Sequence, residues 1–262
     1  MNLAHLIPQL QAQLRYGASQ GLEPVSVPPF TFFYNPDSDS LFANYAIPDM
    51  PIEGDLRDAL ATLKTAFHER GRTPRLEYLE GFAPDLAQAL EANGFIQEIR
   101  TLLMVCTPDS YRTPQEVPGL VIRLVHGNSP MADQRAAVTV QRRSFGSDDA
   151  PEVTEEEAIQ YFTRWARQQM FLAKVNGEPV SVASLMPPYQ GLAEVAGIAT
   201  LSAFRRQGIG AAITAHAVQR GFEQGLGAVF LTAMDERTGR VYTRVGFQGI
   251  GSGLAYVKYP SI

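Results

Sequence analysis

Two arginines and two glycines lie close together at one turn in the second half of the chain, in the segment RRQGIG at residues 205–210. An apolar run typical of a strand precedes the turn at residues 193–200, and an alanine-rich run typical of a helix follows it at residues 207–224. The first turn of a helix has about four backbone N–H groups without a partner, and the helix dipole favours negative charge there. Glycines allow an anion to approach those groups, and arginines add compensating charge. The segment therefore predicts an anion site, most simply for a diphosphate.

Three kinds of phosphate-binding loop could form such a turn, and the spacing of the glycines separates them. A Walker A loop needs a Gly-Lys pair, and the chain has none. A dinucleotide-binding G-x-G-x-x-G/A loop needs a small residue where the chain has Ile213, and the arginines and the late position of the turn also argue against it. The remaining pattern, R-x-x-G-x-G, is satisfied by Arg205, Gly208 and Gly210.

This pattern is one of two motifs by which the sequence resembles the GCN5-related N-acetyltransferase (GNAT) superfamily. The segment TLSAFRRQGIG at residues 200–210 is similar to the acyl-CoA pyrophosphate loop of that family, and YTRVGF at residues 242–247 is similar to its Tyr-x-x-x-Gly-Phe segment. The two motifs follow in the family's order, with a predicted helix and strand between them, and the resemblance covers about residues 119–262. One departure is Ser202, where many members have proline; the turn is then less rigid, but its amides are unaffected.

The resemblance implies a mixed α/β fold of the acyl-CoA N-acyltransferase (GNAT) type and an acetyl-CoA-dependent N-acetyltransferase. In such an enzyme the acetyl group passes to a primary amine by direct attack in a ternary complex. Backbone N–H groups of residues 206–211 would hold the pyrophosphate. The strand that ends at Thr200 would pair with the pantetheine arm and polarise the thioester carbonyl through a backbone N–H, where it diverges from the strand predicted at residues 228–234. The cofactor-binding residues implied in this way are Ile198, Ala199, Thr200, Arg205, Arg206, Gln207, Gly208, Ile209, Gly210 and Ala211.

The family pattern also implies two catalytic residues. Tyr242 would protonate the leaving thiolate, and the ordinary phenol pKa of about 10 suits a thiol of comparable basicity. Glu194, on the strand that leads to the loop, would take a proton from the acceptor ammonium, directly or through water. Simpler interpretations stay open, since Tyr242 could be a helix residue packed on the core and Glu194 a solvated carboxylate. Arg244 is similar to a basic residue that often follows the tyrosine and could approach the CoA phosphates.

The first half of the chain repeats part of this pattern. A short predicted helix ends in Gly-Phe before a strand both at residues 89–95 and at residues 241–247, and strand, helix and strand follow in the same order. The first half has no R-x-x-G-x-G loop, and Leu90 stands where the second half has Tyr242. We therefore expect a degenerate, shortened and catalytically silent GNAT-like repeat, with an unrelated α/β cap domain as the alternative.

A proline-rich segment separates the two halves. Residues 107–119 contain three prolines between apolar runs, which is typical of an extended linker. The expected division is therefore a degenerate GNAT-like or α/β cap domain at residues 1–112 and the catalytic GNAT domain at residues 118–262.

The composition limits the class of protein and its partners. The 262 residues carry a formal net charge of −5, which argues against nucleic acid or an anionic membrane as the main partner and favours a cationic acceptor. There is no secretory signal and no apolar stretch of about 18 residues, so a cytoplasmic location is expected. The single cysteine, Cys106, and four widely spaced histidines predict neither a disulfide nor a metal site. The expected partner is a small-molecule or peptide amine, and a homodimer stays open.

The sequence leaves other functions open. A non-catalytic acyl-CoA-binding regulatory module would need the same loop but neither Tyr242 nor Glu194. An acyltransferase for longer acyl chains or a nonamine acceptor would differ only in the dimensions of its site, and a small amine, an antibiotic, an amino acid and a protein N-terminus all fit as acceptors. Asp148 and Asp149 lie where the family places the acceptor and could attract an amine, but loop solvation is the simpler explanation. His216 is expected to be a surface or half-buried residue without a catalytic role.

Overall fold

The computed structural model describes residues 3–52 and 54–259, which divide into two compact units. The first unit consists of the residues up to Met104, the segment Thr232–Glu236 and the residues from Gly249 onward. The second consists of Val105–Leu231 and Arg237–Gln248. Neither unit is one continuous stretch of sequence, and the expected division into residues 1–112 and 118–262 stays a prediction.

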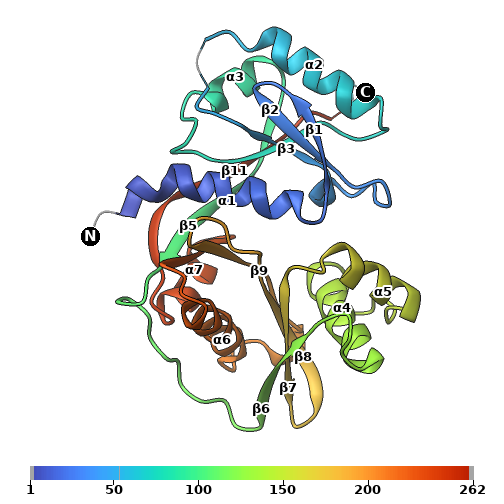
Figure 1. Ribbon diagram of the computed structural model, residues 1–262, viewed down its shortest axis with the longest axis vertical. Helices are drawn as coiled ribbons and strands as arrows, with labels where there is room; N and C mark the ends of the chain where they lie inside the picture. The colour runs from blue at the N-terminus through green and yellow to red at the C-terminus, as the bar shows by residue number, and fades with distance from the viewer. Residues whose placement is uncertain (1–2, 53, 260–262) are drawn as a thin grey trace. The chain divides into compact units, whose positions relative to one another are not determined.

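The first unit is a mixed sheet with helices packed against it (Figure 1). Its elements are η1 (Leu3–Leu6), α1 (Ile7–Ser19), β1 (Glu23–Val27), β2 (Phe30–Tyr34), η2 (Leu41–Ala43), β3 (Tyr45–Pro48), α2 (Arg57–His68), β4 (Arg75–Leu79), α3 (Leu86–Ala92), β5 (Ile96–Cys106, whose last two residues belong to the second unit) and β11 (Gln248–Val257). The strands β1, β2 and β3 pair antiparallel in that order, and β3 pairs parallel with β4. Apolar side chains of α2 and α3 share one core with these strands, in which the rings of Phe32 and Phe67 stack with centroids 3.7 Å apart.

The last strand of the chain belongs to this first unit. β11 pairs antiparallel with β4, so that Gly253 lies opposite Leu79 and Val257 opposite Arg75. A segment that directly follows the second motif in sequence thus completes the sheet of the first half.

The second unit contains both motifs. Its elements are β6 (Leu120–Val125), α4 (Met131–Phe145), α5 (Glu155–Arg164), β7 (Gln169–Val175), β8 (Glu178–Leu185), β9 (Leu192–Thr200), η3 (Ser202–Phe204), α6 (Ile209–Glu223), β10 (Ala228–Ala233, whose last two residues belong to the first unit) and α7 (Glu236–Thr243). The strands lie in the order β6-β7-β8-β9-β10, antiparallel except for β9 and β10. Figure 1 shows α4 and α5 on one face of this sheet and α6 on the other.

Local sequence signals explain where elements of the second unit begin and turn. The pattern Thr-x-x-Glu at residues 154–157 forms a capping box at α5, where the Glu157 amide donates to Thr154 Oγ1 (3.2 Å) and the Thr154 amide donates to Glu157 Oε2 (2.8 Å). The Asn-Gly pair between β7 and β8 forms a hairpin turn at Asn176 and Gly177, whose φ angles of 51° and 89° are those of a type I′ turn. Each of these signals depends on only a few neighbouring residues.

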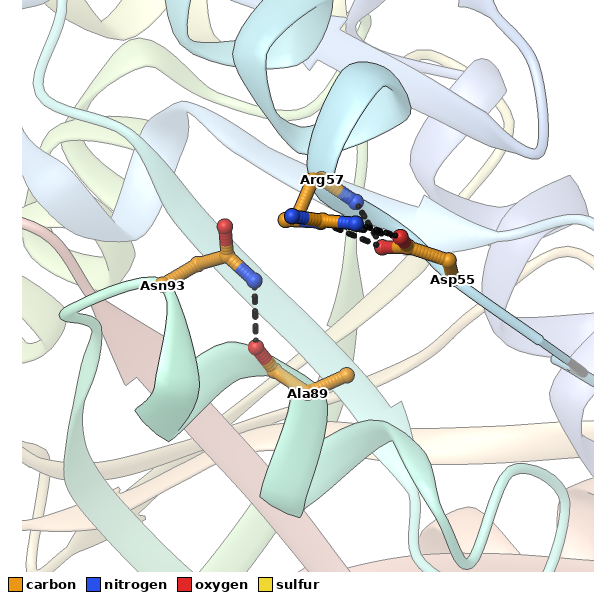
Figure 2. Close-up of polar contacts among 4 residues, drawn as sticks. All are labelled: Asp55, Arg57, Ala89 and Asn93. Atoms are coloured by element: carbon orange, nitrogen blue, oxygen red, sulfur yellow. Dashed lines mark hydrogen bonds and ion pairs between the residues drawn. The ribbon is translucent and has the colours of Figure 1, made fainter.

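The two halves of the sequence contain the same order of elements, β1-β2-β3-α2-β4-α3-β5 in the first and β7-β8-β9-α6-β10-α7-β11 in the second. In each, three antiparallel strands are followed by a helix, a strand parallel to the third, a short helix and a further strand, although β11 itself lies in the first unit. Figure 2 shows the end of the short helix α3, where the Asn93 side-chain amide donates to the Ala89 carbonyl (2.8 Å). The backbone closes α3 and α7 by equivalent hydrogen bonds, namely Asn93 to Leu90, Gly94 to Glu91 and Phe95 to Leu90 in the first, and Val245 to Tyr242, Gly246 to Thr243 and Phe247 to Tyr242 in the second.

Candidate active site

The parallel strands β9 and β10 pair over only part of their length. Leu192, Ala193 and Glu194 lie opposite residues 228–230, whereas β9 continues to Thr200. Both strands are fully described, and no pairing between them extends beyond Glu194. The edge of β9 that faces away from β8 therefore has no partner strand along its second half, as the family resemblance implies.

A bulge lies in this second half of β9. The register with β8 shifts by one residue between the pairs Ser184–Ala196 and Val182–Ala199. Gly197 within this stretch has φ of 61°, a left-handed conformation that glycine adopts at little cost. The extra residue leaves backbone groups outside the ladder next to the stretch predicted to hold the pantetheine arm.

The turn between β9 and α6 combines two left-handed residues. Arg206 has φ of 65°, which costs a residue with a side chain about 1–2 kcal/mol, and Gly208 has φ of 85°. Left-handed residues in such a turn direct successive N–H groups toward one concave surface, the arrangement that binds anions. Throughout the described chain, no hydrogen-bond acceptor pairs with the backbone N–H groups of residues 206–211; in α6, the first amide to find one is Ala212, bonded to the Gly208 carbonyl (3.0 Å).

The two glycines of the loop meet different demands. A Cβ at Gly208 would be strained by the left-handed φ and would lie 3.4 Å from Val117 Cγ2. A Cβ at Gly210 would be unstrained and would have only ordinary contacts, 3.7 Å from Thr200 Oγ1 and 4.0 Å from Val241 Cγ1. The fold thus requires glycine at 208 but tolerates a side chain at 210, where glycine keeps the first turn of α6 accessible to a ligand.

The structure distinguishes the two arginines of the loop. Arg205 Nε donates to the Thr200 carbonyl (3.0 Å), so this side chain ties the turn back to the end of β9. Within the described residues, the side chain of Arg206 forms neither a hydrogen bond nor an ion pair, and it is exposed. Arg244, which directly follows α7 in the sequence, is exposed as well. Both arginines of the loop are exposed, and within the described residues Arg206 is the one whose side chain has no protein partner.

Tyr242 lies near the end of α7 and is almost buried, with 7% of its surface exposed. Its ring stands edge-on to that of Phe247, with centroids 6.1 Å apart. Burial raises the pKa of its phenol to about 12. The hydroxyl therefore holds its proton at neutral pH, which is the state that a general acid requires.

Glu194 lies at the last residue where β9 and β10 pair, opposite Phe230. It is half-buried, and its carbonyl accepts a hydrogen bond from the Met186 amide (2.8 Å). This places the predicted base on the strand that leads to the loop, at the point where the two strands separate.

The other polar residues considered in the sequence analysis have contacts within the protein or are buried. Ser202 Oγ donates to Asp148 Oδ2 (2.5 Å), a contact that joins the α4–α5 connection to the turn after β9. His216 is half-buried against the edge of Phe171, and burial lowers its pKa. Cys106 is fully buried and its thiol pKa is raised by burial, which does not suit a nucleophile. The described residues hold no group of three potential metal ligands.

The described residues between β3 and α2 of the first unit form no counterpart of this loop. At the start of α2, the Arg57 amide donates to Asp55 Oδ1 (3.0 Å), and the Arg57 guanidinium pairs with Asp55 Oδ2 (2.6 Å), as Figure 2 shows. Arg57 lowers the pKa of Asp55, so a carboxylate of the protein itself faces this helix terminus. Leu90, fully buried, stands at the place of Tyr242.

Comparison with known proteins identifies the second unit. Residues 139–247, which contain the loop, Glu194 and Tyr242, match the profile of the acetyltransferase (GNAT) family. Residues 139–247 thus form a GNAT domain, and the family that they match is one of acetyltransferases. No curated protein matches the sequence of the chain.

Solved GNAT structures share the fold over the whole chain. A GCN5-related N-acetyltransferase from Kribbella flavida has a TM-score of 0.79 and 25% identity, covering 98% of this chain and 96% of its own. One from Sphaerobacter thermophilus has a TM-score of 0.61 and 16% identity, covering 89% and 82%. A tandem GNAT protein from the clavulanic acid biosynthesis pathway has a TM-score of 0.59 and 14% identity, covering 100% and 97%. The predicted GNAT fold with an N-terminal repeat is thereby confirmed.

None of the helices in the described part of the chain has the length and hydrophobicity of a membrane span.

Proposed function

We propose that the protein is an acetyl-CoA-dependent N-acetyltransferase that transfers an acetyl group to a primary amine by direct attack in a ternary complex. One observation carries the proposal: the backbone N–H groups of residues 206–211 have no partner in the described chain, and they lie where α6 begins and β9 ends. Such a set of donors at a helix N-terminus suits a diphosphate. When bound, acetyl-CoA supplies the acetyl group as an activated thioester.

The residues of the loop divide the binding of the diphosphate among them. The amides of residues 206–211 donate hydrogen bonds, and Gly210 leaves room for the anion above the first turn. Arg206 adds a free positive charge, whereas Arg205 holds the turn against Thr200. Arg244 is a second exposed cation beyond Tyr242.

The second half of β9 suits the pantetheine arm, because it is extended backbone without a partner strand on one edge. The Leu201 amide donates to the Val180 carbonyl (3.0 Å), so the groups of β9 that face β8 alternate with groups that face away. In this alternation, Ala199 faces β8, while Thr200 and the Ile198 carbonyl, which shares a peptide with the Ala199 N–H, face the free edge. These are therefore the groups that would pair with the arm.

Tyr242 and Glu194 supply the proton transfers. The amine must lose a proton as its bond to the acetyl carbon forms, and Glu194 would accept it directly or through water. A leaving thiolate must gain one, and Tyr242 holds a proton at neutral pH because its pKa is raised to about 12. The net charge of −5 favours a cationic acceptor.

Calorimetric titration with acetyl-CoA, followed by release of free thiol against a panel of primary amines, tests the proposal. We expect saturable binding and amine-dependent thiol release, the latter reduced in Glu194→Gln and Tyr242→Phe. Binding without turnover for every amine would instead indicate a regulatory acyl-CoA-binding module. Absence of acetyl-CoA binding would refute the proposed function.

A further inference from the structure

Ser181 lies on β8, outside both motifs, and its side chain is fully buried against the end of β9. Its Oγ donates to the Ala199 carbonyl (2.6 Å) and lies 2.9 Å from Thr200 Oγ1. Ser181 and Thr200 are opposite each other in the register of the two strands. A buried hydroxyl from a neighbouring strand thus contacts two consecutive residues of the predicted cofactor strand.

The protons in this contact have one consistent arrangement. A serine hydroxyl has a single proton, and here it goes to the Ala199 carbonyl, which cannot donate. In the contact between the two hydroxyls, Thr200 Oγ1 must therefore be the donor and Ser181 Oγ the acceptor. The result is a directed chain in which Thr200 Oγ1 donates to Ser181 Oγ, which donates to the Ala199 carbonyl.

This chain of hydrogen bonds ends on one peptide unit. The carbonyl of Ala199 and the N–H of Thr200 belong to the same planar trans peptide, so they point in opposite directions. The Ala199 carbonyl faces β8, where Ser181 donates to it, so the Thr200 N–H points to the opposite edge of β9, where pairing with β10 has ended at Glu194. A hydrogen bond to a peptide carbonyl also polarises the N–H of that peptide and makes it a stronger donor.

We propose that Ser181 is a positioning residue that acts through the Ala199–Thr200 peptide and strengthens the Thr200 N–H as a hydrogen-bond donor to the pantetheine arm of acetyl-CoA. This inference rests on the proposed function, because it assumes that acetyl-CoA binds along β9. It assigns a role to a residue that neither motif contains and that touches no ligand itself.

The contact can first be tested without any ligand. In 15N-labelled protein, Ser181→Ala removes the hydrogen bond to the Ala199 carbonyl, so the amide nitrogen and proton of Thr200 should shift upfield. Ser184→Ala is the matched control, because Ser184 is also buried on β8 but lies opposite Ala196. An unshifted Thr200 amide in Ser181→Ala would overturn the inference, whatever the protein binds.

The role in binding is tested by comparing acetyl-CoA with ADP, which carries a diphosphate but no pantetheine arm. We expect Ser181→Ala to weaken acetyl-CoA binding about threefold, a part of the contribution of one hydrogen bond because the Thr200 N–H can still donate, and to leave ADP binding unchanged. Ser184→Ala should bind both as wild type does. An equal loss of affinity for acetyl-CoA and for ADP, or an unchanged affinity for acetyl-CoA, would refute the positioning role.

Thr200→Val gives a second test should Ser181→Ala fail to fold, because it removes only the first donor of the chain. Thr200→Val should weaken the binding of acetyl-CoA but not of ADP, and by a smaller factor than Ser181→Ala. Thr200→Ser should restore the affinity for acetyl-CoA. An equal loss in Thr200→Val and Thr200→Ser would count against the chain. A wild-type protein that binds ADP and acetyl-CoA equally poorly would instead refute the proposed function itself, with the Thr200 amide shift still reporting the contact.

Discussion

At the scale of single residues, the site depends on which side chains are protonated and on which have no hydrogen-bond partner within the protein. Tyr242 combines near-complete burial with a hydroxyl that stays protonated, and Arg206 is exposed while its neighbour Arg205 is bonded to β9. Both motifs were visible in the sequence. The difference between the two arginines was not, because it depends on the left-handed φ of Arg206 and on one hydrogen bond to Thr200.

Tyr242→Phe should separate chemistry from binding. Removal of the hydroxyl should lower kcat about 100-fold, because the proton of a general acid is lost, while the Kd for acetyl-CoA stays close to that of wild type. Steady-state kinetics and calorimetry measure the two quantities. Tyr34→Phe, in the first unit, is the control and should change neither. An unaltered kcat in Tyr242→Phe would remove its proposed role as acid.

The pH dependence of tyrosine ionisation should reveal the burial of Tyr242. Its pKa is raised to about 12, so ionisation of this phenol begins well above the ordinary value of about 10. Ultraviolet difference spectra up to about pH 11 should therefore show the same rise at 295 nm in wild type and in Tyr242→Phe. If the variant instead lost the amplitude of one tyrosine in this range, the phenol would be more accessible than the structure shows.

At the scale of elements, the turn from β9 to α6 is the feature on which binding depends. Its local signals could be predicted, as could the capping box at Thr154 and the hairpin at Asn176, since each depends on a few adjacent residues. The contact of Ser202 with Asp148 could not, because it joins residues 54 positions apart. Asp148, predicted as a solvated or amine-attracting residue, is exposed and also accepts a hydrogen bond from the turn.

Gly210→Glu should abolish binding without unfolding the protein. A Cβ there has only ordinary contacts, so the fold should tolerate the change, but a carboxylate above the first turn of α6 would repel and exclude a diphosphate. We expect acetyl-CoA affinity to fall at least about tenfold with little change in Tm. Gly227→Glu, exposed beyond the other end of α6 and equally free of close contacts, is the matched control. Comparable affinity in the two variants would contradict the loop assignment.

At the scale of the whole molecule, the chain contains two units of similar topology with one predicted cofactor site. Sequence similarity at the ends of α3 and α7 predicts the repeat, and equivalent backbone hydrogen bonds support it. The pairing of β11 with β4 could not be predicted, because strand partners distant in sequence are set by the register of the sheet and by packing rather than by local preference.

The two units predict a binding stoichiometry. The start of α2 already faces the carboxylate of Asp55, and Leu90 replaces the tyrosine, so the first unit should bind no acetyl-CoA. Calorimetry on the full chain should give one acetyl-CoA per chain. A stoichiometry of two would show that the repeat retains a site.

The central claim is that the amides of residues 206–211 hold the diphosphate of acetyl-CoA, and titration of 15N-labelled protein with acetyl-CoA tests it most directly. The account predicts large, saturable shifts of the amide resonances of residues 206–211, together with those of the second half of β9. Saturable binding that leaves these amides unshifted would contradict it.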